Sequence, residues 1–272
     1  MRARVRLALG GDVTEGDDLP ARDGSRRFAA RRGAESALVT VFPRSPAGPT
    51  PEDLRTIVDR FRATQHAALV LPRHAADIEG RACLVTVRPA AATALELLQR
   101  GAPIPVAQAT RILRDVARAL ATLHRSGHAH GSLDLDNVHV IESGAVVSDL
   151  GLRSDGSVAA DLEALGRIGY ALLAGDLPTA PPVPLARHRR AVPAELNRLI
   201  HALLDPDVLR RPASAEAVLY QLDSVPSRHP GSLASFLDGA THGARFPRSA
   251  GVRLLLAGLG VLLVAALINA RA

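Results

Sequence analysis

The stretch from His124 to Leu152 constrains the fold more than any other part of this 272-residue chain. An amphipathic helical pattern leads into it, and a polar loop containing Ser132 follows and ends at Asn137. Two short apolar runs, joined by a turn at 142–144, then predict a β-hairpin. Asp149 comes directly after the second run and begins an Asp-x-Gly motif. Helix, polar loop, hairpin and Asp-x-Gly therefore follow one another in a defined order and spacing.

This order and spacing resemble the catalytic core of the eukaryotic-type Ser/Thr protein kinases of bacteria. In that family the loop reads His-Arg-Asp-Leu and ends in Asn, and Asp-Phe-Gly follows the hairpin. In this chain the same frame reads His130-Gly-Ser-Leu with Asn137, followed by Asp149-Leu-Gly. Ser132 thus occupies the position of the family's catalytic base. The resemblance implies an α+β, two-lobed protein-kinase-like fold, with a small β-rich lobe on a helical lobe.

Two further motifs of the same family follow in the expected order. Residues 161–178 resemble a family helix that begins with Asp, and residues 205–214 resemble its Asp-Pro-x-x-Arg-Pro-Ser signature. By this resemblance, Asp161 holds the backbone of the polar loop through hydrogen bonds. Arg211 has lost the family's acidic partner, so we expect it to cap carbonyl groups or to pair with another acid. Because Asp161 comes only ten residues after Gly151, the activation segment and the peptide-docking shelf of kinases are missing.

The resemblance is weaker in the N-terminal half. Residues 36–42 are apolar and β-branched, which predicts a strand similar to the family's Val-Ala-Ile-Lys strand. Thr40 falls on or beside the position of that Lys, and the chain has no Lys at all, because its 33 basic residues are Arg. The next helix is predicted to start at 50–51, and its family Glu, which would pair with the Lys, falls near Ile57. Only Gly24 lies where the family has its glycine-rich lid.

Asn137 and Asp149 match the magnesium ligands of the family. We therefore assign them as the candidate metal-binding and cofactor-binding residues, and we expect weak Mg-ATP binding that depends on the metal. In the structural alternative, Asn137 braces the loop and Asp149 caps a turn. A metal cluster of His124, His128 and His130 is disfavoured, because the resemblance places His130 in the packed interior.

An apolar segment near the C-terminus predicts a membrane anchor. Residues 254–268 carry no charge, and we place one transmembrane helix at 251–270. The alternative is a buried terminal helix, but the segment is apolar on every face and follows a linker rich in Pro, Gly and Ser at 225–250. Arginines concentrated before the span favour a single-pass protein of the cell membrane with a cytoplasmic kinase-like domain. The remaining boundaries are an N-terminal segment at 1–26, a small lobe at 27–88 and a large lobe at 89–224.

Composition narrows the class of partner. A net charge of +6 and a pI near 10.9 would suit nucleic acid, but the arginines are scattered and aromatic residues make up only 3%. We therefore expect the membrane and signalling proteins as partners, and no nucleic acid. The single Cys83 excludes an internal disulfide.

Three functions remain open from the sequence. The first is a pseudokinase, a catalytically inactive kinase-like module that acts at the membrane as a signalling scaffold or as a binding module for nucleotide or partners. The second is an active Ser/Thr protein kinase with relocated chemistry, in which Asp134 or Asp136 serves as the base. The third is a small-molecule phosphotransferase of kinase fold, which would not need the peptide shelf but would need a base and a phosphate clamp. The missing base, Lys and activation segment favour the first.

Overall fold

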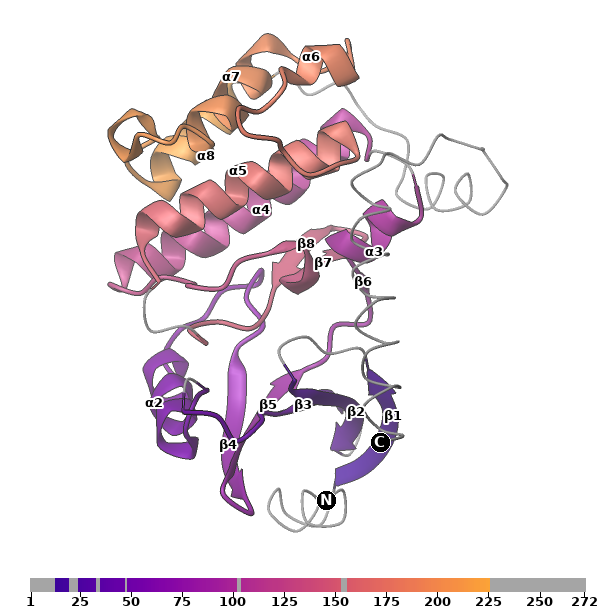
Figure 1. The fold of residues 1–272 in the computed structure, drawn as a ribbon, viewed down its shortest axis with the longest axis vertical. Helices are drawn as coiled ribbons and strands as arrows, with labels where there is room; N and C mark the ends of the chain where they lie inside the picture. The colour runs from indigo at the N-terminus through magenta and orange to yellow at the C-terminus, as the bar shows by residue number, and fades with distance from the viewer. Residues whose placement is uncertain are drawn as a thin grey trace, which may run out of the picture.

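The computed structural model describes residues 13–19, 24–32, 35–46, 48–101, 104–152 and 156–225. These residues form two lobes, a small one built on a β-sheet and a large one built of helices (Figure 1). This mixed architecture agrees with the expected α+β class and is compatible with a kinase-like fold. The predicted linker beyond Val225 and the predicted transmembrane helix at 251–270 lie outside the described residues. Within the described part of the chain, no helix is long and apolar enough to cross a membrane.

A five-stranded antiparallel sheet forms the small lobe, in the order β1-β2-β3-β5-β4. Apolar side chains of three strands and Cys83 of a fourth pack together as a separate small core beside the sheet. The strands are β1 (Val13–Leu19), β2 (Arg26–Arg32), β3 (Glu35–Val41), β4 (Pro72–Ile78) and β5 (Arg81–Val87).

The sheet differs from the sequence prediction at two strands. β1 lies within residues 1–26, which we expected to precede the small lobe, and its acidic sequence shows no apolar alternation; only its pairing with β2 identifies it as a strand. The apolar composition of residues 67–71 also predicts a strand, but this run is a connection, and β4 begins after it at Pro72. Because β4 is an edge strand, its first residue can be Pro without the loss of a ladder hydrogen bond.

The apolar run before β4 ties the small lobe to the large one. Leu69 forms a parallel bridge with Val147 of the hairpin. The N–H of Val70 donates to the carbonyl oxygen of Val147 at 2.7 Å, and the N–H of Val147 donates to that of Ala68 at 2.8 Å. The run is therefore buried and extended as its composition suggests, but its partner is the other lobe.

Helix α2 (Pro51–Phe61) begins as the sequence predicts. The hydroxyl of Thr50 accepts from the N–H of Asp53 at 3.1 Å, and the Asp53 carboxylate accepts from the N–H of Thr50 at 2.8 Å. The buried face of the helix carries Leu54, Ile57 and Phe61. The position expected for the family's Glu thus lies on the apolar face.

The large lobe is built around two long helices, α4 (Val106–Arg125) and α5 (Val158–Ala174), which lie side by side (Figure 1). Gly166 allows α7 (Ala194–Leu203) to approach α5 closely, because a Cβ at this position would lie 2.7 Å from the Cβ of Leu203. The other elements are β6 (Ala92–Thr93), α3 (Ala94–Gln99), the 3-10 helix η1 (Leu135–Asn137), β7 (Val138–Ile141), β8 (Gly144–Val147), α6 (Leu185–His188), α7 (Ala194–Leu203), η2 (Val208–Arg210) and α8 (Ala215–Asp223).

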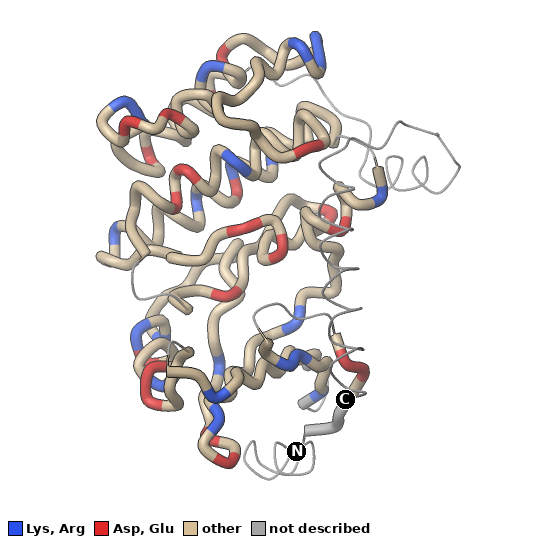
Figure 2. Tube along the Cα trace, viewed as in Figure 1, with Lys and Arg blue, Asp and Glu red and all other residues tan. Residues whose placement is uncertain are grey.

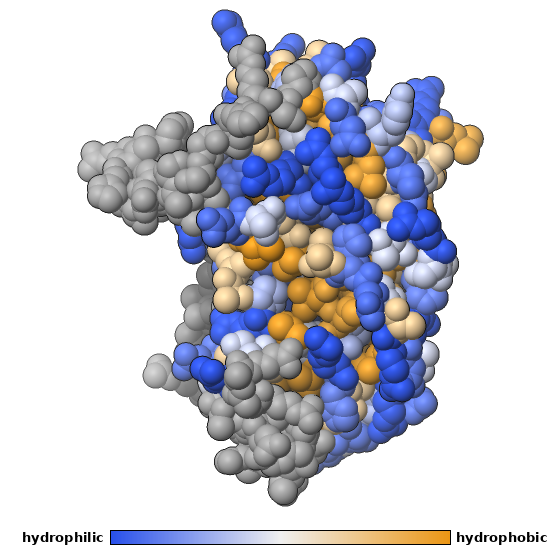
Figure 3. Space-filling view, turned by 180° about the vertical axis from the view of Figure 1, so that it is seen from behind, coloured by the Kyte–Doolittle hydropathy of each residue, from blue (hydrophilic) through white to orange (hydrophobic). Residues whose placement is uncertain are grey.

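On the surface, apolar and polar residues are segregated, whereas basic and acidic residues are mixed. Figure 2 shows arginines spread over both lobes and interspersed with acidic residues. Seen from behind, apolar side chains reach the surface in a hollow about halfway along the molecule, and hydrophilic residues surround them (Figure 3). The exposed apolar part of this face therefore lies near the junction of the two lobes.

Candidate functional site

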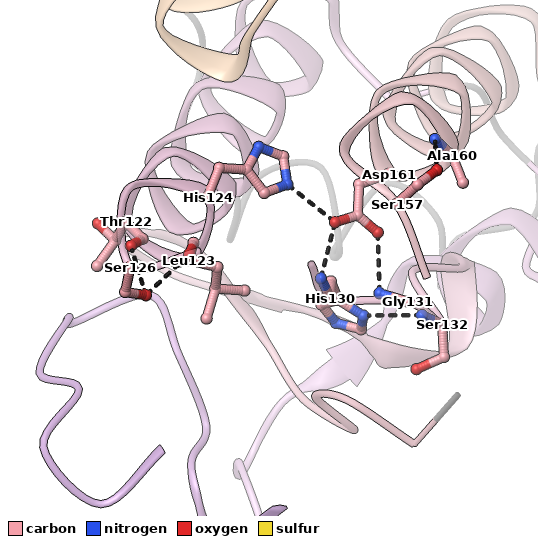
Figure 4. Close-up of polar contacts among 10 residues, drawn as sticks. All are labelled: Thr122, Leu123, His124, Ser126, His130, Gly131, Ser132, Ser157, Ala160 and Asp161. Atoms are coloured by element: carbon pink, nitrogen blue, oxygen red, sulfur yellow. Dashed lines mark hydrogen bonds and ion pairs between the residues drawn. The ribbon is translucent and has the colours of Figure 1, made fainter. Parts of the chain in front are cut away.

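The polar loop is held in place by one buried carboxylate. Asp161 of α5 is only 2% exposed, and its Oδ2 accepts from the N–H of His130 at 2.7 Å. Its Oδ1 accepts from the N–H of Gly131 at 2.9 Å, and Nε2 of His124 lies 2.9 Å from Oδ2 (Figure 4). Asp161 thus fixes the loop backbone, as the resemblance implies.

His130 forms the inner wall of the loop. Its Nε2 lies 3.0 Å from the carbonyl oxygen of Ser148, and its Nδ1 accepts from the N–H of Ser132 at 3.3 Å, so these partners assign the proton to Nε2. Burial of the ring lowers the pKa of His130, although the nearby carboxylates of Asp161 and Asp149 oppose the shift. His130 is therefore a neutral structural residue.

The other two histidines of the sequence cluster turn to different partners. His124 contacts Asp161, whereas the ring of His128 packs edge-on against the ring of Phe61, with centroids 5.5 Å apart. The structure therefore gives each of the three histidines, His130 included, a packing or bracing role.

Ser132, at the position of the catalytic base, braces the loop against the Asp-x-Gly turn. Its hydroxyl donates to the backbone carbonyl oxygen of Asp149 at 2.7 Å. A serine hydroxyl does not take up a proton near neutral pH, and this one is already used as a donor. The position therefore carries a structural hydrogen bond in place of a base.

Asn137 closes the other end of the loop with both atoms of its amide. Its Oδ1 accepts from the N–H of Asp134 at 2.9 Å, and its Nδ2 donates to the carbonyl oxygen of Ser132 at 2.6 Å. The residue is buried and ends the 3-10 helix η1. These contacts match the bracing role considered for Asn137 as the structural alternative.

Asp149 lies in the left-handed region of the backbone, with φ at 62°. This conformation is uncommon for residues other than glycine, although Asp adopts it more readily than most. Oδ2 of Asp149 is 3.1 Å from Nη2 of Arg27, which projects from β2 of the small lobe. The two side chains are 10% and 24% exposed, respectively, so the ion pair is largely buried between the lobes.

Arg27 was missed by sequence reasoning. In the β2–β3 register it stands directly opposite Thr40, the residue at or beside the position of the family's Lys. Because the chain has no Lys, a permanently charged basic side chain at this place had to be an arginine. Which arginine it is depends on the pairing of two strands, and no local pattern encodes that pairing.

The Asp-x-Gly turn also contacts α2 through apolar atoms. A Cβ on Gly151 would lie 2.9 Å from the ring of Phe61 and 3.9 Å from a methyl carbon of Ile57. Ile57 thus faces the turn from the position near which the family's Glu is expected. An apolar contact takes the place of the missing Lys–Glu pair.

Gly156, which comes just before α5, lies against the polar loop. A Cβ on Gly156 would collide with the Cα of Gly131, and it would lie 3.6 Å from the Cβ of Ala129. Gly131, whose φ is 75°, stands where the family has the Arg of His-Arg-Asp. Gly156, which precedes α5 where kinases have the activation segment, is therefore in contact with Gly131, which stands in place of the Arg.

Arg211 has found new partners, in both of the ways expected. Its Nη2 lies 2.9 Å from the carboxylate of Glu163 on α5. Its Nε donates to the carbonyl oxygen of Asp205 at 2.8 Å, and its Nη1 donates to that of Ala159 at 3.0 Å. The guanidinium thus ties the start of α5 to the chain before η2.

The expected magnesium site fits these contacts poorly. Magnesium takes oxygen ligands in a strict octahedral arrangement. The Oδ1 of Asn137 already accepts a backbone N–H, and a guanidinium lies against the carboxylate of Asp149. A divalent cation at that carboxylate would meet the like charge of Arg27. The assignment of Asn137 and Asp149 as metal ligands stays a prediction, and the geometry argues against it.

Comparison with known proteins agrees with the resemblance in the sequence. No family model matches the chain. Over 237 residues it is 26% identical to a protein described as serine/threonine-protein kinase pkn2 of Myxococcus xanthus. The similarity covers 68% of this chain and 28% of that protein. The domain is kinase-like. Because the chain spans less than a third of this relative, the relative's activity is not carried over as a finding.

Proposed function

We propose that this kinase-like protein is a pseudokinase, which transfers no phosphate and binds nucleotide or signalling proteins as a scaffold at the membrane. One observation carries the proposal: the hydroxyl of Ser132, in the position of the base, is committed to the carbonyl oxygen of Asp149 at 2.7 Å. A general base must be able to accept the substrate's proton near the working pH. This side chain serves the structure of the loop.

The other family positions support the same proposal. Thr40 stands at or beside the position of the phosphate-binding Lys, Ile57 lies near that of its Glu, and a short link replaces the activation segment. Loss of a general base alone typically costs about 10²–10⁴-fold in rate. The losses need not add, because catalytic residues act as a unit. Each of them nevertheless removes a different part of the machinery.

The relocated-base alternative depends on two acids of the loop. The Oδ1 of Asp134 accepts from the N–H of Leu135 at 2.7 Å and caps η1. This capping role accounts for Asp134 without any catalytic chemistry.

Phosphate transfer from labelled ATP tests the proposal directly. We expect the full-length protein to label neither itself nor a generic basic substrate above the background of the Asp149→Ala variant. Labelling by the wild type that Asp149→Ala abolishes would instead establish an active kinase. If the label then disappears in Asp134→Asn or in Asp136→Asn, the base has been relocated to that residue.

The membrane part of the proposal depends on the sequence of residues 251–270. Within it, the ten Leu, Ile and Val residues of 254–268 would contribute about −3 to −6 kcal/mol to insertion. We expect the full-length protein to stay with the membrane in carbonate at high pH and to be released by detergent. Release by carbonate alone would refute the anchor.

A further inference from the structure

We propose that Arg27, which pairs with Asp149 between the two lobes, binds the phosphate groups of a nucleotide directly, without a divalent metal. This inference rests on the nucleotide-binding part of the proposed function. It replaces the metal-dependent binding that the sequence predicted.

The sheet puts Arg27 on the correct face for this role. Residues directly opposite each other on adjacent antiparallel strands project from the same face of a sheet. Arg27 is paired in this way with Thr40. Its guanidinium therefore reaches Asp149 from the strand next to the one that would carry the family's Lys.

Arg27 also has donor capacity left for a ligand. Its Nη2 contacts Asp149, whereas its Nε is buried and has no hydrogen-bond partner among the described residues. A buried N–H group without a partner is costly, so an acceptor at this place would be stabilising. The planar fork of guanidinium donors matches the oxygens of a phosphate group in geometry and charge.

Asp149 acts in this arrangement as the counterion that positions Arg27. Its carboxylate lies 3.1 Å from Nη2, and its left-handed backbone directs the side chain into the space between the lobes. A phosphate bound to Arg27 would be close to this carboxylate and would be repelled by it. Asp149 is therefore expected to weaken phosphate binding, the opposite of its role as a magnesium ligand.

The two models make opposite predictions for one conservative variant. Asp149→Asn removes the charge and keeps a residue that tolerates the left-handed conformation. If a metal bridges Asp149 to the phosphates, the variant loses ATP binding. If Arg27 holds the phosphates, the variant binds ATP as tightly as the wild type or more tightly.

The experiment measures ATP binding to the full-length protein by equilibrium dialysis, once in EDTA and once in magnesium. We expect the wild type to bind with the same affinity in both. Arg27→Gln should lose about tenfold or more in affinity in EDTA, since a charge-assisted hydrogen bond is replaced by a neutral one. Arg27→Lys keeps the charge without the fork and should fall between the two.

Arg26→Gln is the matched control. Arg26 precedes Arg27 on β2, so its side chain projects from the opposite face, and it is 56% exposed. We expect its ATP affinity to equal that of the wild type. A melting curve for each variant separates loss of binding from loss of folding.

Every outcome bears on the inference. Binding that needs magnesium, or that Asp149→Asn abolishes, overturns the role of Arg27 and leaves the proposed nucleotide binding intact. Unchanged affinity of Arg27→Gln in EDTA overturns it as well. Absence of ATP binding in both conditions overturns the inference together with the nucleotide-binding part of the proposed function, whereas the phosphate-transfer test remains separate.

Discussion

The two sides of the junction between the lobes differ from the kinase pattern in different ways. On the side of the large lobe, Asp161 holds the loop as in a kinase and Arg211 keeps its place with new partners. On the side of the small lobe, Thr40 and Ile57 replace the charged pair, and Arg27 supplies a cation from another strand. The contacts that fix the backbone of the loop therefore match the kinase pattern, whereas the side chains at the positions that bind ligand in kinases do not.

This difference has a physical cause. Buried backbone N–H groups need acceptors whatever the protein does, so the loop depends on Asp161 even without catalysis. Charged side chains that contact only a ligand are needed only for that ligand. They can be replaced when the ligand or the reaction changes. If so, variants that affect the loop should destabilise the fold, and variants that affect the charges should change binding.

The largest effect is expected from Asp161→Ala. The change removes the acceptor of two backbone N–H groups and of the His124 ring, all in a buried place. We expect the free energy of unfolding to fall by about 3–5 kcal/mol, as when one partner of a buried polar network is removed. Unfolding in urea, followed by circular dichroism, measures it.

Asp223→Ala is the control for that variant. Asp223 also pairs with an arginine, Arg114, but its side chain is 68% exposed. We expect a loss below about 1 kcal/mol, because exposed ion pairs contribute little. If both variants cost the same, the large lobe does not depend on its buried carboxylate and the comparison fails.

A smaller effect is expected from Gly156→Ala in the short link. The new methyl group would collide with the backbone of Gly131, which cannot rotate away as a side chain can. Overpacking of this kind typically costs about 1–3 kcal/mol. Gly48→Ala is the control, because the nearest atom to its Cβ would be at an ordinary 3.5 Å. A neutral Gly156→Ala would show that the link is free to move off the loop.

The smallest effect is a dependence of stability on pH. Burial lowers the pKa of His130 in the polar loop and of His139 in the β7–β8 hairpin below the ordinary value of 6.5. Below that value the unfolded chain takes up protons that the folded one does not, so stability falls as the pH drops. The slope is at most about 1.4 kcal/mol per pH unit for each histidine.

Urea unfolding at about pH 7.5 and about pH 5.5 measures this loss of stability, since the two values lie above and below the unfolded pKa of histidine. His139→Gln should make the slope shallower. If the slope stays the same, His139 does not contribute to the pH dependence of stability.

The sequence predicted the large lobe better than the small lobe. Helices are local, so the periodic apolar face of α4 and the capping motif of α2 were readable, and the motifs around Asp161 and Arg211 gave their roles. β1 was not readable, because its partner strand and not its own pattern makes it a strand. Arg27 was missed for the same reason. Strand register is set by contacts between distant residues, and it decides which side chain of the sheet faces the large lobe.

The bridge between Leu69 and Val147 is a connection between the lobes that a bound ligand cannot open. With the hydrogen bonds beside it, it joins the lobes through backbone atoms, which no ligand can replace. The ion pair of Arg27 and Asp149 joins the lobes through side chains, and an anion can compete for it. A phosphate group that draws Arg27 away from Asp149 would open one connection and leave the other closed.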